Sequence, residues 1–124
     1  VAEKQPWMNG EVGTGKEVQV KTYPLKSMLK VIGKHDLVVD FWSLDTEGSE
    51  AAILSAIDFT EITIGILYVE HNGESEKQQK IMKVLENSNL KLFKTLGQDY
   101  LYYNPKYFIE RGVTDVTTLI SKCK

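Results

Sequence analysis

The chain has 124 residues, of which 42% are hydrophobic and 26% are charged, with a formal net charge of −2 and a single cysteine. This length allows one globular domain with a real core and excludes two domains. No segment approaches the ~20 apolar residues of a membrane span, and one thiol cannot form an intrachain disulfide. The near-neutral charge argues against nucleic acid, since phosphate binding needs a concentrated basic surface. We therefore expect no membrane partner and no nucleic-acid partner.

The segment before residue 37 predicts loop, strand and helix in turn. Residues 1–17 are rich in glycine with little apolar periodicity, which predicts a loop or irregular segment. Residues 17–23 alternate apolar and polar side chains, as in a short half-exposed strand. Pro24 then suits the start of a helix that ends before Gly33. The apolar positions expected to face inward on this helix are Leu25, Met28, Leu29 and Ile32.

The middle of the chain alternates strand and helix. Residues 37–44 form a nearly continuous apolar run, which predicts a central strand covered on both faces. Residues 47–57 predict a helix packed on the sheet, and residues 62–69 predict a second buried strand. A further helix is expected over residues 74–88. Its inward side chains are predicted to be Ile81, Met82, Val84 and Leu85.

The C-terminal part predicts a hairpin and a helical tail. Residues 90–96 and 99–103 read as two strands joined by a tight turn at Gly97-Gln98. One short helix follows Pro105, and another is expected around residues 113–120. The whole predicts an α/β fold with parallel central strands, an antiparallel C-terminal hairpin and helices packed on the sheet. We expect one domain over residues 18–104 and a helical tail over 105–124.

Charge is segregated along the chain. Between Lys34 and Lys77 there are ten acidic residues and no Lys or Arg, whereas the remainder holds all fifteen basic residues and seven acids. This pattern fits either a set of solvated faces or an acidic rim suited to a cationic ligand. In parallel sheets, ligands bind beyond the carboxyl ends of the strands. Residues 44–50 and 70–73 are expected at that edge, and both lie in the acidic block.

These two segments carry a family resemblance. The runs 39–59 and 62–72 resemble the C-terminal half of FkbM-type S-adenosylmethionine-dependent methyltransferases, in which an apolar strand ends in Asp-x-Glu-Gly-x-Glu and a second strand ends in Glu. The matching residues are Asp45, Glu47, Gly48, Glu50 and Glu70. The resemblance implies a partial Rossmann-like methyltransferase fold with S-adenosylmethionine as cofactor. It further implies methyl transfer to a hydroxyl of a small-molecule or carbohydrate-like acceptor.

In that family, the first half of the fold holds most of the cofactor through a glycine-rich loop after the first strand. No such strand and loop occurs before Val18. The resemblance therefore implies a fragment that lacks this loop. The alternative is a non-catalytic, truncated methyltransferase-like module that serves binding or oligomerisation. Loss of the early strands would also expose one edge of the first central strand, so a homodimer through that edge is a further possibility.

The resemblance also implies roles for individual residues. Methyl transfer needs an aligned acceptor and, for a hydroxyl, a group that removes its proton. Asp45 and Glu47 are the predicted catalytic residues, and Asp45 and Gly48 are predicted to contact the cofactor. The predicted substrate-binding residues are Glu50, Glu70, His71 and Asn72. No metal ion is predicted.

Other readings of the same residues stay open. Asp45 can serve as a helix N-cap, and Glu50 can simply favour the positive end of the helix. His71 can be an ordinary loop histidine. Together with Glu70, Asp45 and Glu47, the same histidine offers the ligand types of a metal-ion site.

Overall fold

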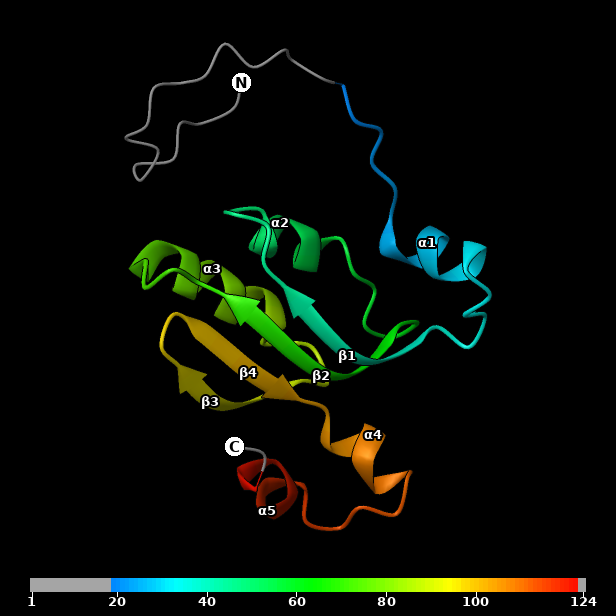
Figure 1. The fold of residues 1–124 in the computed structure, drawn as a ribbon, viewed down its shortest axis with the longest axis vertical. Coiled ribbons are helices and arrows are strands. Elements are labelled where there is room, and N and C mark those ends of the chain that lie inside the picture. The colour runs from blue at the N-terminus through cyan, green and yellow to red at the C-terminus, as the bar shows by residue number, and fades with distance from the viewer. Residues whose placement is uncertain (1–18, 123–124) are drawn as a thin grey trace.

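A computed structural model of the chain describes residues 19–122. The segment predicted to be irregular, residues 1–17, lies outside the described residues, as does residue 18, the predicted start of the domain. The elements in chain order are α1 (Leu25–Val31), β1 (Val38–Leu44), α2 (Glu50–Ser55), β2 (Thr63–Glu70), α3 (Ser75–Leu85), β3 (Lys91–Leu96), β4 (Asp99–Tyr103), α4 (Pro105–Ile109) and α5 (Val116–Ser121). Figure 1 shows their arrangement.

The strands form one four-stranded sheet in the order β1-β2-β4-β3. β1 and β2 are parallel, with Val38 opposite Thr63 and Leu44 opposite Val69. β4 runs antiparallel to both of its neighbours, and β3 and β4 form the predicted hairpin. The predicted α/β class, with parallel strands followed by an antiparallel hairpin, is confirmed.

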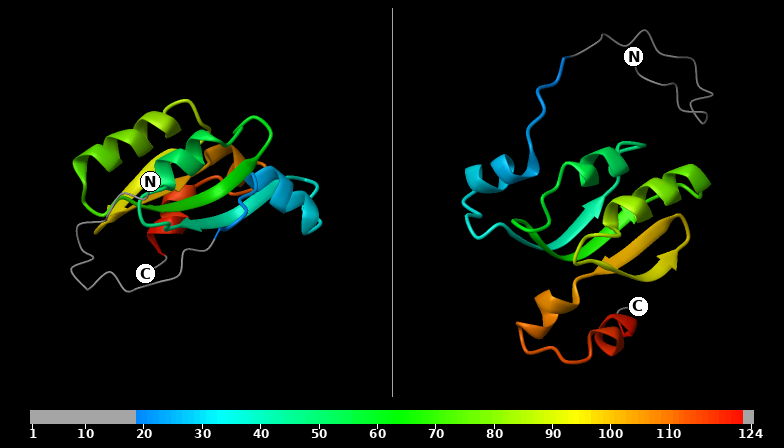
Figure 2. Two further views of the ribbon diagram at one scale, coloured as in Figure 1. Left: turned by 90° about the horizontal axis from the view of Figure 1, so that it is seen from above. Right: turned by 180° about the vertical axis from the view of Figure 1, so that it is seen from behind.

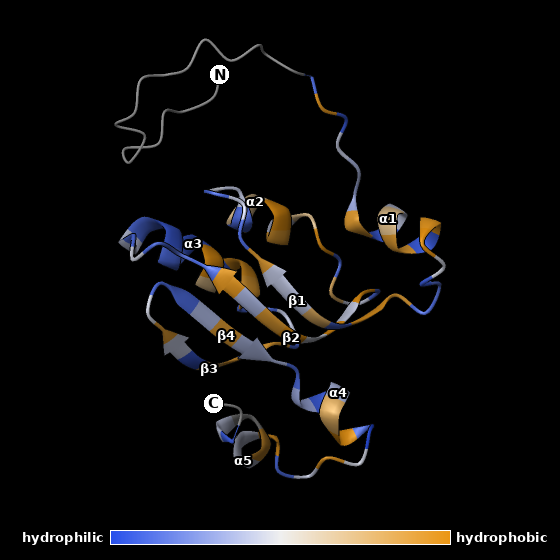
Figure 3. Cartoon of the chain, in the orientation of Figure 1, coloured by the Kyte–Doolittle hydropathy of each residue, from blue (hydrophilic) through white to orange (hydrophobic). Residues whose placement is uncertain are grey.

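Helices α2 and α3 cover one face of the sheet, as the two views in Figure 2 show. Leu54 of α2 and Ile81 of α3 are completely buried in one apolar cluster with Leu67 and Val69 of β2. Figure 3 shows the strongly hydrophobic colouring along β2, as expected for a strand with neighbours on both sides. No helix in the described part of the chain is long and apolar enough to cross a membrane.

Two predictions about strands are wrong. Residues 19–23, which belong to the strand predicted over 17–23, have no regular structure. β1 was predicted to be a central strand covered on both faces, but it lies at one edge of the sheet, and Phe41 at its middle is 60% exposed. An apolar run indicates a strand without specifying its neighbours, because the position of a strand in a sheet depends on distant segments.

Three side chains predicted to face inward are exposed. Met28 on α1, Ile32 at the C-cap of α1 and Met82 on α3 are 53%, 71% and 49% exposed. Each helix turns only a narrow stripe toward the core, centred on Leu29 in α1 and on Ile81 in α3. The flanking apolar positions therefore lie outside the buried stripe.

Helix α4 is held to the sheet at a glycine. A Cβ atom on Gly65 of β2 would lie 2.6 Å from the Asp40 carbonyl oxygen and 2.8 Å from Cε1 of Tyr107. The Tyr107 hydroxyl donates a hydrogen bond to the Asp40 carboxylate, and the Arg111 guanidinium lies 3.7 Å from the centroid of the Tyr107 ring. Only glycine leaves room for this ring at the start of β2.

We predict that Gly65→Ala destabilises the fold by about 1–3 kcal/mol, because the added methyl group meets backbone as well as a ring and cannot be accommodated by a side-chain rotation. Urea unfolding followed by circular dichroism measures the change. Thr95→Ala, at an exposed position of β3, is the control and should leave the unfolding midpoint nearly unchanged. Equal stability of the Gly65→Ala variant and the parent would contradict the close packing of α4.

Candidate active site at the carboxyl ends of two parallel strands

The predicted site residues come together where β1 and β2 end. Leu44 lies opposite Val69 in the parallel pair. The next residue along each strand, Asp45 and Glu70 respectively, therefore lies at the same edge of the sheet. Carboxylate oxygens of Asp45, Glu50 and Glu70 all lie within 4.8 Å of one another. Asp45 is exposed, Glu70 is half-buried and Glu50 is completely buried. Three of the predicted site residues therefore meet in one cluster.

The turn that leads from β1 into α2 has a left-handed backbone. Glu47 has φ 55° and Gly48 has φ 115°, a value that side chains with a Cβ rarely adopt. Both residues are exposed. The helix begins at Glu50 with Ser49 at the N-cap, and the Ser49 side chain makes no capping hydrogen bond. Asp45 is thus not the N-cap of α2, which leaves its carboxylate outside the helix.

The Glu50 carboxylate closes this turn. It accepts hydrogen bonds from the Thr46 N–H at 2.7 Å and from the Gly48 N–H at 3.2 Å. Burial would raise the pKa of Glu50, but these N–H groups, its own N–H and the Lys77 ammonium outweigh burial and lower the pKa. Glu50 was predicted to bind substrate, and that role stays a prediction. Its side chain is completely enclosed and serves as the internal cap of the turn.

Lys77, on the first turn of α3, supplies the positive charge of the cluster. Its Nζ lies 3.0 Å from the Glu50 Oε2 and 3.7 Å from the Glu70 Oε2, and its side chain is only 10% exposed. The predictions from sequence missed this residue. One signal was available, because Lys77 occupies the same helical stripe as Ile81 and Leu85, which are four and eight residues further along.

Asp45 and Glu70 form a coupled pair of carboxyl groups. Burial raises the pKa of Glu70, and the neighbouring Asp45 carboxylate raises it further, while the Lys77 ammonium opposes both effects. The Asp45 carboxylate, a like charge beside it, therefore makes Glu70 hold its proton more tightly.

The turn after β2 is anchored by His71. This side chain is 1% exposed, its ring lies 4.2 Å from the centroid of Tyr100, and its Nδ1 accepts a hydrogen bond from the Gly73 N–H at 3.0 Å. That acceptor role places the ring proton of a neutral imidazole on Nε2. Asn72 has φ 53° and is half-buried. The predicted substrate roles of His71 and Asn72 stay predictions, and the observed role of His71 is to hold the turn.

The acids between Lys34 and Lys77 make several separate contacts. Glu61 pairs with Lys26, Asp36 with Lys34, and Glu76 with Lys80, all near the surface. Only the carboxylates around Asp45 and Glu70 gather at the ends of the parallel strands. Most of the acids between Lys34 and Lys77 therefore lie on solvated faces. The cluster at the strand ends is the part of this segment that fits the predicted acidic rim.

Two hollows on the described part of the surface lie away from the cluster. One of about 420 Å³ lies between α3 and the hairpin and is lined by residues that include Met82, Leu92 and Tyr102. Another of about 270 Å³ lies beside the start of α4. Neither of these two hollows is lined by a residue of the carboxylate cluster.

We predict that Lys77→Met destabilises the fold by about 3–5 kcal/mol, because the buried Glu50 carboxylate loses its counter-ion. Thermal unfolding measures the change, with Lys80→Met as the control on the same helix, where the exposed pair with Glu76 contributes little to stability. The double variant Lys77→Met/Glu50→Gln should recover part of the loss, since no buried charge is then left unpaired. Additive losses in the double variant would contradict the coupling.

Comparison with known proteins identifies the family. The model of the methyltransferase FkbM domain matches residues 3–102, which include the entire sheet except Tyr103 and all the residues of the carboxylate cluster. Searches of curated proteins and of solved structures found no match. The family model covers most of the chain, and the sheet and its acidic edge agree with the fold that the family resemblance implied. The chain therefore belongs to the FkbM methyltransferase domain family.

Proposed function

We propose that the chain carries the acceptor side of an S-adenosylmethionine-dependent O-methyltransferase that acts on a hydroxyl of a small-molecule or carbohydrate-like substrate. The observation that supports this proposal most directly is the coupled pair of Asp45 and Glu70 at the ends of two parallel strands. A carboxyl pair at this edge suits a hydroxyl acceptor, which must lose a proton as it is methylated. Family membership supplies the reaction class.

In this proposal, Asp45 accepts the proton of the acceptor hydroxyl. Asp45 is the exposed member of the pair, whereas Glu70 is half-buried and holds its own proton more tightly. Asp45 is thus the group that an incoming hydroxyl can reach. Glu47, exposed on the same turn, is the second candidate for this contact, and the left-handed Gly48 keeps side-chain bulk away from it.

Glu50 and Lys77 act as positioning residues. The Glu50 carboxylate holds the N–H groups of Thr46 and Gly48, which fixes the turn that presents Asp45. The Lys77 ammonium lies between Glu50 and Glu70 and limits the accumulated negative charge. The end of β2 and the turn after it carry the predicted substrate contacts Glu70, His71 and Asn72. In this proposal, that turn borders the acceptor site.

The carboxylates of the cluster fit one part of the cofactor. S-adenosylmethionine supplies an electrophilic methyl group on a sulfonium cation, and the carboxylates of Asp45 and Glu47 have the charge that attracts a cation. An adenosine group also needs an enclosed, largely apolar pocket. The two hollows described above are not lined by this cluster. We therefore propose that Asp45 and Gly48 contact the cofactor only near its sulfonium group.

We predict that Asp45→Asn lowers the rate of methyl transfer by about 10²–10⁴-fold, since the amide cannot accept the hydroxyl proton. Transfer of a radiolabelled methyl group to a panel of hydroxyl acceptors measures the rate. Glu110→Gln at the C-cap of α4, an exposed acid that pairs with Lys106, is the control and should keep the full rate. Equal rates for Asp45→Asn and the parent would remove Asp45 from the proposed chemistry.

Binding of the cofactor product separates the enzyme from the alternative. If S-adenosylhomocysteine binds the chain in calorimetry and binding weakens in Asp45→Asn, the cofactor proposal stands. If calorimetry detects no binding at millimolar ligand, the chain is a non-catalytic methyltransferase-like module. The observation that favours this second candidate is that neither of the two hollows described above is lined by the cluster.

The raised pKa of Glu70 predicts a pH dependence of stability. A carboxyl with a higher pKa in the folded state binds its proton more tightly there, so folding loses stability as pH rises through the unfolded-state pKa of about 4.3 toward the higher folded-state value. The side chain introduced by Glu70→Gln does not ionise. We predict that this variant gains stability relative to the parent between pH 4 and pH 7, measured by urea unfolding at each pH. A difference that is independent of pH would contradict the shift.

A further inference from the structure

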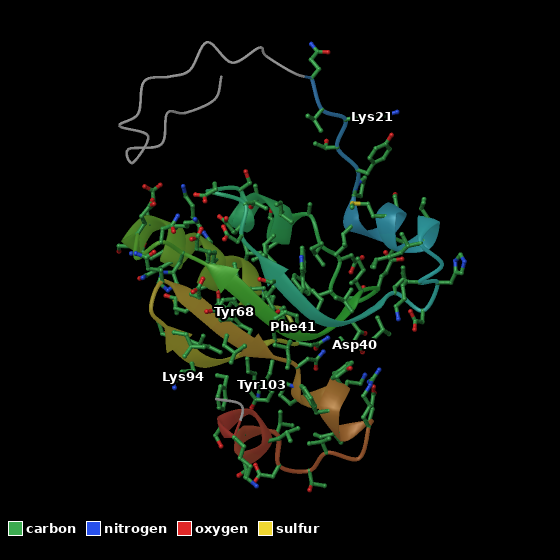
Figure 4. The ribbon with its side chains drawn as sticks, viewed as in Figure 1. Lys21, Asp40, Phe41, Tyr68, Lys94 and Tyr103 are labelled. Atoms are coloured by element: carbon green, nitrogen blue, oxygen red, sulfur yellow. The ribbon has the colours of Figure 1, made fainter. Side chains whose placement is uncertain are left out.

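A polar hollow lies at the end of the sheet opposite the carboxylate cluster. The cluster is at the end of β2, whereas Asn104, which lines the hollow, donates its backbone N–H to the Gly65 carbonyl near the start of β2. Figure 4 labels Tyr103, the last residue of β4 and the neighbour of Asn104, close to α4. The hollow has a volume of about 270 Å³ and is lined by Ser88, Asn89, Lys91, Asn104, Pro105 and Lys106. It is therefore separate from the candidate active site.

The charge of this lining has one sign. Two lysines, Lys91 and Lys106, line the hollow, and no acidic residue does. Lys91 is exposed and makes no ion pair with a described residue. The Nζ of Lys106 lies 3.8 Å from the Glu110 carboxylate, in a pair whose two side chains are both exposed. Such a pair is weak, so an anion in the hollow can compete for Lys106. The lining therefore favours a negatively charged ligand.

The Asn104 side chain adds a buried hydrogen-bond donor. Asn104 is 4% exposed, and its Oδ1 accepts a hydrogen bond from the Tyr107 N–H at 3.2 Å. This bond fixes which end of the amide is the oxygen, and so identifies the other end as the NH₂ group. The NH₂ group donates to no described residue and yet is not fully enclosed, so it reaches the surface at the hollow. A ligand oxygen would satisfy this donor.

Hydrogen bonds fix both walls of the hollow. The Ser88 Oγ donates to the Leu85 carbonyl at 2.7 Å and accepts from the Leu90 N–H at 3.1 Å, which holds the connection between α3 and β3. On the other side, the Asn104 N–H donates to the Gly65 carbonyl at 2.8 Å. A ligand that binds between walls already in place pays little for ordering them.

We propose that this hollow binds a phosphate group of a small molecule, held by the ammonium groups of Lys91 and Lys106 and by the NH₂ group of Asn104. Two lysines balance the charge of a phosphate dianion, whereas a carboxylate offers one negative charge. Pockets that enclose a whole drug-sized ligand have volumes of ~300–1,000 Å³. A hollow of about 270 Å³ therefore takes one group of a ligand rather than a whole cofactor. This inference does not rest on methyl transfer.

Titration of the isotopically labelled full chain with inorganic phosphate, followed through its amide resonances, tests the site. We expect shifts at residues 88–91 and 104–107, including the side-chain NH₂ of Asn104, and none at residues 45–50 or 70–73. Lys91→Gln and Lys106→Gln should each weaken phosphate binding by about tenfold, because each removes a charged donor. Lys94→Gln, an exposed position on the same strand but outside the lining, is the matched control and should leave binding unchanged.

Other anions test the chemical class and the source of the phosphate. At one ionic strength, glycerol phosphate should bind at least as tightly as inorganic phosphate, and acetate more weakly than both. Vesicles that contain phosphatidic acid should not sediment the chain, and sedimentation with them would overturn the small-molecule source. Equal shifts with acetate and phosphate, spread over lysines elsewhere, would show an adventitious ion only and overturn the proposal. So would a Lys91→Gln variant that folds, as judged by circular dichroism, and binds phosphate as tightly as the parent.

Discussion

The buried ion pair between Lys77 and Glu50 is the constraint on which the candidate site depends. Glu50 is completely enclosed at the start of α2, and a charge in that position needs both hydrogen bonds and a counter-ion. It receives hydrogen bonds from the turn after β1 and the ammonium from α3. One carboxylate therefore ties the end of a strand and the starts of two helices into a single arrangement.

This arrangement divides the acids of the edge by role. The pKa of Glu50 is lowered, so this carboxyl stays ionised inside the fold. The pKa of Glu70 is raised by burial and by the neighbouring Asp45. Asp45 stays at the surface, where a ligand can reach it. Three carboxyl groups thus differ in state, one ionised and enclosed, one that holds its proton more tightly and one exposed, because burial and neighbouring groups differ over a few ångströms.

The two edges of the sheet also differ. β3 carries lysines and an irregularity at the hairpin edge, whereas β1 is the edge strand next to the candidate site in the described part of the chain. The strand that delivers Asp45 to the site is therefore also an edge strand of the described sheet.

Local pattern in the sequence was sufficient to predict the order of strands and helices from α1 onward, the hairpin at Gly97 and the meeting of Asp45 with Glu70. Apolar runs, helical periodicity and turn residues act within a few neighbours, and the ends of parallel strands meet by geometry. The exposure of Phe41, the enclosure of Glu50 and His71, and the entry of Lys77 into the cluster needed the tertiary structure. Each depends on which distant segment packs there, and a lysine in an acidic environment is buried only where the fold brings carboxylates to it.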